Sequence, residues 1–193
     1  PVLLATCMLA VLSSLVYSQA TVLWVMIIAR ILQGAGGALS TLRAGAVVID
    51  CSTALPESTV RMAQAVASAG GRFLDAPMTR TPKEAAEGRL NLLVGGDAAL
   101  FAECRPLLAC FAENIVHAGA VGAGHQMKLL HNYVSLGMVA LLAEAAAGAR
   151  KAGIAMDTFV DVLAKGGGAG VGLERIRQHL LTGDPTNMRF SIA

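Results

Sequence analysis

The stretch GAVVIDCSTALPESTVRMAQAVASAGGRFLDAP, residues 45–77, alternates between two kinds of local pattern. Residues 45–50 form a short run rich in β-branched side chains. A Ser/Thr-rich start then opens an amphipathic helix, which two glycines stop. Residues 72–77 resemble a second strand. This order predicts a strand–helix–strand unit and argues for a parallel sheet with helices on its faces.

The alternation continues toward residue 121. Residues 88–96 predict a third strand that glycines close, residues 97–112 predict a helix, and residues 114–119 predict a last strand. We therefore expect an α/β fold over residues 43–121, with an incomplete Rossmann-like and mainly parallel sheet.

Beyond Gly124 the pattern becomes all-helical. A helix from about His125 to Ala152 contains no proline, and Gly153 fits the position just after its last turn. The helix is apolar nearly all round, so we expect it to be buried between domains or subunits. Residues 122–193 thus predict a long interdomain helix followed by the start of an all-α domain, which we expect to be truncated.

Residues 1–42 differ from the rest of the chain. Residues 1–29 contain no Asp, Glu, Lys or Arg, and two apolar runs predict helices. The stretch ARILQGAGGAL, residues 29–39, resembles a membrane helix of major facilitator transporters, so we expect a membrane-helix-like fragment joined to an unlike chain. Gly34 and Gly36 are not expected to form a dinucleotide-binding turn, because no predicted strand precedes them.

Composition argues against several classes of partner. The net charge is +2 and no basic block is present, so nucleic acid is not expected to bind. The four cysteines and four histidines lack the spacing of metal ligands or of a disulfide framework, and no metal is expected. We expect a cytoplasmic protein with reduced thiols, in which only residues 1–40 are apolar enough to offer a membrane anchor.

One group of candidate functional residues lies on the long helix. Lys128 and Asn132 are four residues apart and share a helical face, and Gly124 lies one turn earlier on that face. A glycine lets a ligand or another backbone approach closely. A lysine that loses hydration there has a lowered pKa, which suits it to proton transfer. The alternative is a lysine that extends past apolar side chains to solvent.

A second group follows predicted strand ends. In DAPMTRT, residues 75–81, Thr79 offers a hydroxyl and Arg80 can hold a carboxylate or sulfonate with two parallel hydrogen bonds. The alternative is an ordinary surface turn. Thr53 lies just past another strand end, where it could face a cofactor or could cap the following helix.

These segments resemble the β-hydroxyacid dehydrogenase family from about residue 43 to residue 193. The resemblance rests on GAVVIDCSTALP, on FLDAPMTRTPKEAAEGRLNLLVGGD and above all on GAVGAGHQMKLLHN. The last stretch follows the family pattern G-x-x-G-x-G-x-x-x-K-x-x-x-N at every defined position. It implies an enzyme that transfers hydride between the nicotinamide of NAD or NADP and a small hydroxyacid or its semialdehyde.

The resemblance also implies a role for each candidate residue. Lys128 would be the catalytic acid/base and Asn132 would assist it. Thr79 and its neighbours, with Gly124, would hold the substrate, and Thr53 would lie near the nicotinamide. The pair Thr79–Arg80 replaces the Ser-Gly that the family usually shows and is similar to sulfolactaldehyde reductases, which favours a small substrate with a strong anionic end.

The family's N-terminal strand, glycine-rich turn and ribose-binding acidic residue are not recognisable in residues 1–42, so we expect weak dinucleotide binding. We expect a homo-oligomer formed through the long helix. Two alternatives to an active oxidoreductase stay open. One is a membrane-anchored or non-catalytic structural protein, and the other is a pseudoenzyme that uses the sheet and the long helix for dimerisation.

Overall fold

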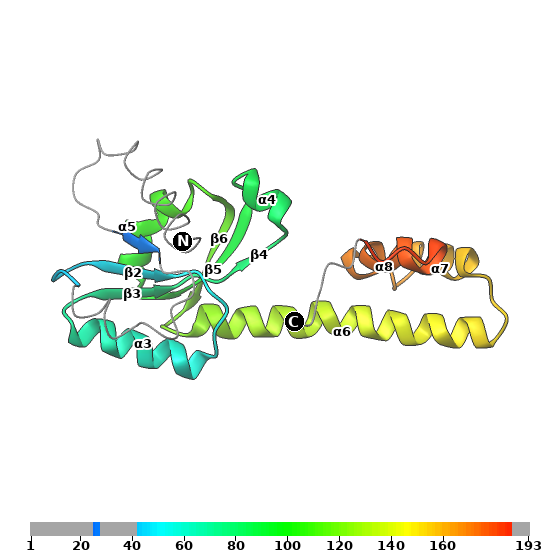
Figure 1. The fold of residues 1–193 in the computed structure, drawn as a ribbon, viewed down its shortest axis with the longest axis horizontal. Coiled ribbons are helices and arrows are strands. Elements are labelled where there is room, and N and C mark those ends of the chain that lie inside the picture. The colour runs from blue at the N-terminus through cyan, green and yellow to red at the C-terminus, as the bar shows by residue number, and fades with distance from the viewer. Residues whose placement is uncertain (1–24, 28–41, 187–193) are drawn as a thin grey trace, which may run out of the picture. The chain divides into compact units, whose positions relative to one another are not determined.

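The computed structural model describes residues 25–27 and 42–186. Its elements, in chain order, are β1 (Val25–Ile27), β2 (Val47–Asp50), α3 (Pro56–Ser68), β3 (Arg72–Asp75), β4 (Met78–Thr79), α4 (Pro82–Ala86), β5 (Leu90–Gly96), α5 (Ala98–Leu108), β6 (Ala112–Gly119), α6 (Ala123–Lys151), α7 (Met156–Ala164) and α8 (Val171–Thr182). The chain forms two compact units, Pro1–Lys128 and Leu129–Ala193, and α6 crosses from one to the other (Figure 1).

The sheet has the order β1-β2-β3-β5-β4, and β6 pairs with β5. Strands β1, β2 and β3 are parallel, as predicted, and β6 is parallel to β5. Strand β5, however, runs antiparallel to β3, so the mainly parallel sheet contains an antiparallel step that was not predicted. The short strand β4 runs in the direction of β3, and the chain then reverses through the segment that contains the short helix α4. Strand β5 therefore pairs antiparallel with both β3 and β4.

Helices α3 and α5 cover opposite faces of this sheet (Figure 1). Successive side chains of a strand point to opposite faces. Ile49 and Leu74 belong to a core cluster with Leu100 and Leu108 of α5, whereas Val48 and Phe73 pack with Val66 of α3. The strand sequences VVID and RFLD are therefore apolar at consecutive positions because both of their faces are buried.

Most of the predicted apolar helical segment, residues 1–42, lies outside the described residues, as do Gly34 and Gly36. Residues 25–27 are described, and they form a strand that pairs with β2, so the predicted helix is wrong for these three residues. The edge of β2 offers a parallel partner there. Local hydropathy does not reveal such a pairing.

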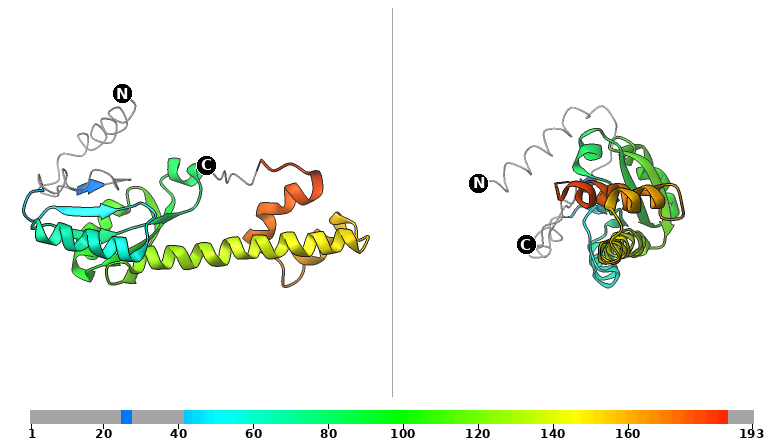
Figure 2. Two further views of the ribbon diagram at one scale, coloured as in Figure 1. Left: turned by 60° about the horizontal axis from the view of Figure 1, so that its bottom comes forward. Right: turned by 90° about the vertical axis from the view of Figure 1, so that its right-hand side faces the viewer.

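Helix α6 is a single unbroken helix (Figure 2), and Gly153, with φ +74°, follows its last turn as predicted. The expected burial is not found within one chain. Large apolar side chains along it are exposed, including Leu130, Tyr133 and Leu141. Among the described helices it alone has the length and hydropathy of a membrane span, with a mean hydropathy of 1.3. Core helices of soluble proteins share this property.

The unit Leu129–Ala193 has a core of its own. Leu142 and Ala146 of α6 pack with Val160 of α7 and with Leu173 and Ile176 of α8. The glycine-rich stretch 165–170 is an interhelical loop, and α8 ends at Gly183 in the left-handed conformation. This unit is thus a short helical bundle that begins within α6.

Candidate active site

Lys128 lies on the second turn of α6, and its ammonium group is directed toward the loop after β3. Nζ donates a hydrogen bond to the carbonyl oxygen of Met78 over 2.5 Å. The side chain is half-buried, and this loss of hydration lowers the pKa of Lys128 below its usual value. The ammonium therefore meets backbone beside Thr79 instead of extending freely into solvent.

Thr79 ends β4 and is buried, with 6% of its surface exposed. Its hydroxyl oxygen accepts a hydrogen bond from Nδ2 of Asn91 over 3.1 Å, and Asn91 in turn accepts one from Asn114 over 2.9 Å. A threonine hydroxyl has one proton and two lone pairs. Because Asn91 uses a lone pair, the proton of Thr79 stays available for a hydrogen-bond acceptor.

Arg80 has partners within the chain, and its predicted role as a clamp for an anion stays a prediction. Its guanidinium donates to the Arg89 carbonyl oxygen over 2.5 Å and pairs with the Glu113 carboxylate. Among the described non-glycine residues it alone has a positive φ, +85°. The family that the sequence resembles usually carries glycine at this position, so the backbone keeps a glycine-like conformation although the side chain is large.

Replacing Arg80 separately by glycine and by alanine is expected to measure this backbone strain. Both variants lose the exposed ion pair, which contributes little. Only glycine adopts the left-handed conformation without a Cβ clash, so R80G should be more stable than R80A by about 1 kcal/mol. Urea denaturation followed by circular dichroism measures the difference. Equal midpoints for the two variants would show that residue 80 is unstrained.

Gly124 faces the sheet backbone and not an open gap. A Cβ built on it would overlap the Leu93 carbonyl oxygen and would lie 2.7 Å from Oδ2 of Asp75 and 2.9 Å from the Gly95 amide nitrogen. The sequence predicted that either a ligand or another backbone approaches this glycine, and in the structure the backbone of the sheet does so. The glycine lets the first turn of α6 pack directly on β5.

Asn132 and Thr53 are the two remaining candidate residues. Asn132 lies one helical turn after Lys128 on α6, and its Oδ1 is 3.3 Å from Nδ1 of His131. Thr53 is exposed in the loop after β2. Residue Leu55, not Thr53, occupies the N-cap position of α3, so the capping alternative is wrong and the Thr53 side chain stays open to a ligand.

Asp75 and His125 are central to this region although the sequence did not single them out. Both are fully buried. The Asp75 carboxylate accepts hydrogen bonds from the backbone amides of Gly122 and His125, at 2.8 and 2.9 Å. One signal was present in the sequence: an ionisable residue ends the otherwise apolar strand in FLDAP.

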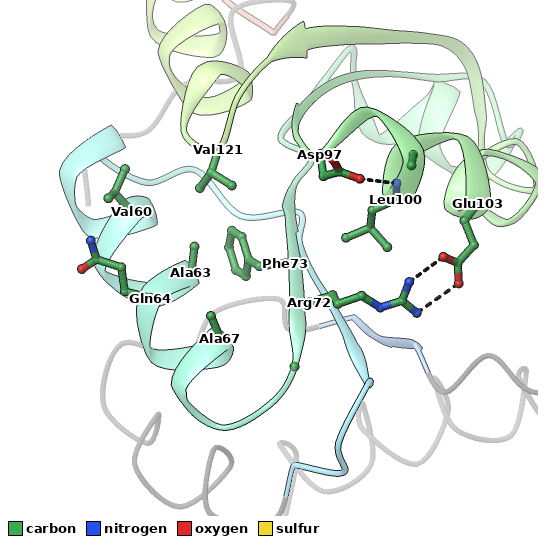
Figure 3. A pocket seen from close by; sticks show the side chains of 12 residues that line it. Val60, Ala63, Gln64, Ala67, Arg72, Phe73, Asp97, Leu100, Glu103 and Val121 are labelled. Carbon is green, nitrogen blue, oxygen red and sulfur yellow. Dashed lines mark hydrogen bonds and ion pairs between the residues drawn. The ribbon is translucent and has the colours of Figure 1, made fainter.

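Two other features of this unit carry no catalytic group. Burial, and after it the Asp50 carboxylate, raises the pKa of Cys51 to about 12, so this thiol stays protonated. A cavity of about 590 Å³ lies over β3, where Ala63 and Ala67 of α3 face Phe73 (Figure 3). None of the candidate residues lines it. Among the described residues, no group of three His, Cys, Asp or Glu side chains could hold a metal ion.

Comparison with known proteins places this arrangement in a family. Residues 11–119, more than half of the chain, match the NAD binding domain of 6-phosphogluconate dehydrogenase. Residues 122–193 match the NAD-binding domain of NADP-dependent 3-hydroxyisobutyrate dehydrogenase. The chain belongs to the β-hydroxyacid dehydrogenase family. The second match contains all of α6, so a domain of this family accounts for the helix that resembles a membrane span.

Two curated relatives are enzymes of this family. The chain is 33% identical over 159 residues to 2-(hydroxymethyl)glutarate dehydrogenase of Eubacterium barkeri, with 82% of this chain and 53% of the relative covered. It is 34% identical over 128 residues to glyoxylate/succinic semialdehyde reductase 1 of Arabidopsis thaliana, with 66% and 44% covered. The chain thus spans about half the length of these dehydrogenase relatives.

A solved structure of a β-hydroxyacid dehydrogenase has the same fold. The 3-hydroxyisobutyrate dehydrogenase of Mycobacterium tuberculosis, solved with L-serine, superposes with a TM-score of 0.71 at 30% identity. The superposition covers 79% of this chain and 53% of that one. The match to the NAD-binding domain begins at residue 11 and so includes most of the segment that resembles a transporter helix, which leaves the transporter resemblance unconfirmed.

Proposed function

We propose that this chain carries the proton-transfer and substrate-holding part of an NAD(P)-dependent hydroxyacid dehydrogenase. The observation that carries the proposal is the half-buried Lys128 ammonium at the carbonyl oxygen of Met78, the residue that directly precedes the buried Thr79. A group able to donate or accept a proton thus contacts the short strand that carries the Thr79 hydroxyl. The enzymatic names of the relatives support the same activity.

Lys128 would exchange a proton with the substrate oxygen. In oxidation, the neutral amine would accept the proton of the substrate hydroxyl as its carbon loses hydride. In reduction, the ammonium would return that proton to the carbonyl oxygen. Partial burial supports both directions, because it lowers the pKa of Lys128 toward the working pH.

The residues present fit a nicotinamide cofactor, which would supply or accept the hydride. Thr53 is exposed beyond the carboxyl end of the parallel strand β2, the edge at which open α/β sheets bind ligands. Its hydroxyl would hold the nicotinamide end of NAD or NADP. Preference for one of the two cofactors would depend on residues near the adenine ribose.

The substrate would be a small anionic hydroxyacid or its semialdehyde. Thr79 would donate its free hydroxyl proton to the acid group, and Asn132 would assist Lys128 from the next turn of α6. Arg80 could add a second contact to the anion only by leaving Glu113 and the Arg89 carbonyl oxygen. Substrates with stronger anionic ends would favour that exchange.

A panel of short 3-hydroxyacids, offered with NAD and with NADP, tests the proposal. Reduction of the cofactor, followed by nicotinamide absorbance, is the expected result. Calorimetric titration of the chain with each dinucleotide separates weak cofactor binding from missing chemistry. A chain that binds both dinucleotides and turns over none of the acids would support the non-catalytic alternative.

The pH dependence of turnover should follow the lowered pKa of Lys128. The ordinary lysine value is 10.5, and burial moves the pKa of Lys128 below it. Oxidation needs the neutral amine, so its rate should rise as pH increases through the lowered pKa. Reduction needs the ammonium, so its rate should fall across the same range. Profiles of kcat/KM in both directions check this, and profiles without these opposite limbs would contradict it.

The exposed side of α6 supports a homo-oligomer. Tyr133 is 80% exposed and Leu141 is 67% exposed, and such apolar surface on a helix favours a covering partner. A second copy of this chain would supply a matching surface, which sedimentation velocity can detect as a dimer or higher species. We also propose that the protein works in the cytoplasm, where its buried thiols Cys51 and Cys104 would stay reduced.

A further inference from the structure

The buried Asp75 carboxylate binds the start of α6 from outside the helix. Its Oδ1 accepts from the Gly122 amide over 2.8 Å, and its Oδ2 accepts from the His125 amide over 2.9 Å. Amides in the first turn of a helix have no partner within the helix. A carboxylate is favourable there, because it meets the positive end of the helix dipole and makes charge-assisted hydrogen bonds.

The His125 ring ties the same turn to two further segments. Nδ1 lies 2.8 Å from the Thr59 hydroxyl of α3 and 3.6 Å from Oδ2 of Asp75. Nε2 lies 3.1 Å from the Ser52 carbonyl oxygen, in the loop that carries Thr53. All of these polar atoms are satisfied within the protein, so the network fixes one arrangement of the turn.

There is little room for this carboxylate to move. A Cβ at Gly95 would lie only 2.5 Å from Oδ1 of Asp75, and one at Gly124 would lie 2.7 Å from Oδ2. Both neighbouring positions are therefore open to the carboxylate only because they are glycines. The close fit turns two hydrogen bonds into a rigid attachment of α6 to β3.

The attachment and the catalytic lysine are linked through short stretches of chain. Lys128 follows His125 by three residues, about one helical turn. Met78, whose carbonyl oxygen binds the Lys128 ammonium, follows Asp75 by three residues. The segment 75–78 thus contacts α6 at two points, once through the Asp75 carboxylate and once through the Met78 carbonyl oxygen.

We propose that Asp75 is a positioning residue, whose buried carboxylate fixes the first turn of α6 and so holds the Lys128 ammonium at the Met78 carbonyl oxygen beside Thr79. A catalytic effect of this positioning rests on the proposed function. The positioning of Lys128 by Asp75 does not depend on that function. A flexible lysine side chain alone has many rotamers. A shift of about 1 Å in a reacting group can cost about a hundredfold in rate, so a fixed helix start matters for turnover.

The test compares Asp75→Asn with Asp97→Asn in the full chain. The amide introduced by Asp75→Asn keeps the shape of the carboxylate but can accept through only one of its two terminal atoms. Asp97 is a matched control, because its carboxylate caps α5 through the Leu100 amide at 2.8 Å and has no contact with Lys128. Acetylation of Lys128 in the folded protein is followed by mass spectrometry across pH, together with kcat and KM.

In D75N we expect Lys128 to become better hydrated, so the midpoint pH of its acetylation should rise toward that of an ordinary lysine. We also expect kcat to fall about tenfold to a hundredfold with a smaller change in KM. D97N should change stability little, because asparagine caps a helix about as well as aspartate, and it should keep the Lys128 midpoint and kcat. A folded D75N with the wild-type midpoint and the wild-type kcat would overturn the proposal.

A second variant tests the proposal if D75N does not fold. Thr59→Val keeps the side-chain volume and removes the hydroxyl at Nδ1 of His125, so it loosens the same turn more gently. The Lys128 midpoint should again rise, by less, and an unchanged midpoint in folded T59V would overturn the proposal. Failure of the proposed function would give a different result. The midpoint pH of Lys128 acetylation would still rise in these variants, but replacing Lys128 itself would leave turnover unchanged.

Discussion

Replacing Lys128 by methionine is expected to lower kcat for hydride transfer by a factor of about 10²–10⁴, the usual contribution of a positioned general acid or base. Methionine keeps the length and apolar stem of lysine, so the half-buried position stays filled and the fold should persist. Only the group that donates and accepts the proton is lost. Steady-state turnover of the best hydroxyacid from the panel, with saturating cofactor, measures the effect.

Lys165→Met is the matched control for this variant. Lys165 lies just after α7, is 74% exposed on its side chain and pairs with Asp161 one helical turn earlier. Its loss removes the same charge from the chain without touching the loop after β3, so kcat should be unchanged. If K128M retained the wild-type kcat while binding cofactor normally, the chain would be a pseudoenzyme and the proposed chemistry would be wrong.

Replacing Gly124 by alanine is expected to destabilise the N-terminal unit by about 3 kcal/mol or more. The added methyl would overlap the Leu93 carbonyl oxygen and would lie 2.9 Å from the Gly95 amide nitrogen. These are backbone atoms of the central strand, so relief requires α6 to move away from the sheet. Overpacking of this kind in a filled core commonly costs about 1–3 kcal/mol and more when backbone must shift.

Gly137→Ala, on the same helix, is expected to have the opposite effect on stability. A Cβ there meets no atom within 4 Å, and alanine is the better helix former. We expect G137A to gain about 0.5–1 kcal/mol. Urea unfolding followed by circular dichroism compares both variants with the wild type. A G124A protein with a wild-type unfolding midpoint would mean that α6 does not pack on β5 in this way.

The elements with strong local patterns were predictable. Strands β2 and β3 and helix α3 have runs of apolar residues, a Ser/Thr-rich start and a glycine stop, all of which act within a few residues. The direction of β5 was not predictable in the same way. It depends on the pairing of β4 with β5, a contact between strands that no local pattern encodes.

The same distinction between local patterns and long-range contacts applies to the residues of the candidate site. Family spacing pointed to Lys128 and Thr79, and the structure brings the Lys128 ammonium to the residue next to Thr79. The orientation of Arg80 toward Glu113 depends on the start of β6, which is 33 residues away in sequence. Likewise, Asp75 binds amides 47 and 50 residues further along the chain. Such partners become visible only when the sheet and α6 are folded together.

The partner of the Lys128 ammonium is a main-chain oxygen, and this choice has a consequence for redesign. A carboxylate in its place would favour the charged form of the amine and oppose proton release. A peptide carbonyl orients the amine without a countercharge, and every amino acid supplies one. The Met78 side chain packs against the core of the sheet, so another apolar side chain of similar size can replace it while the proposed base keeps its anchor.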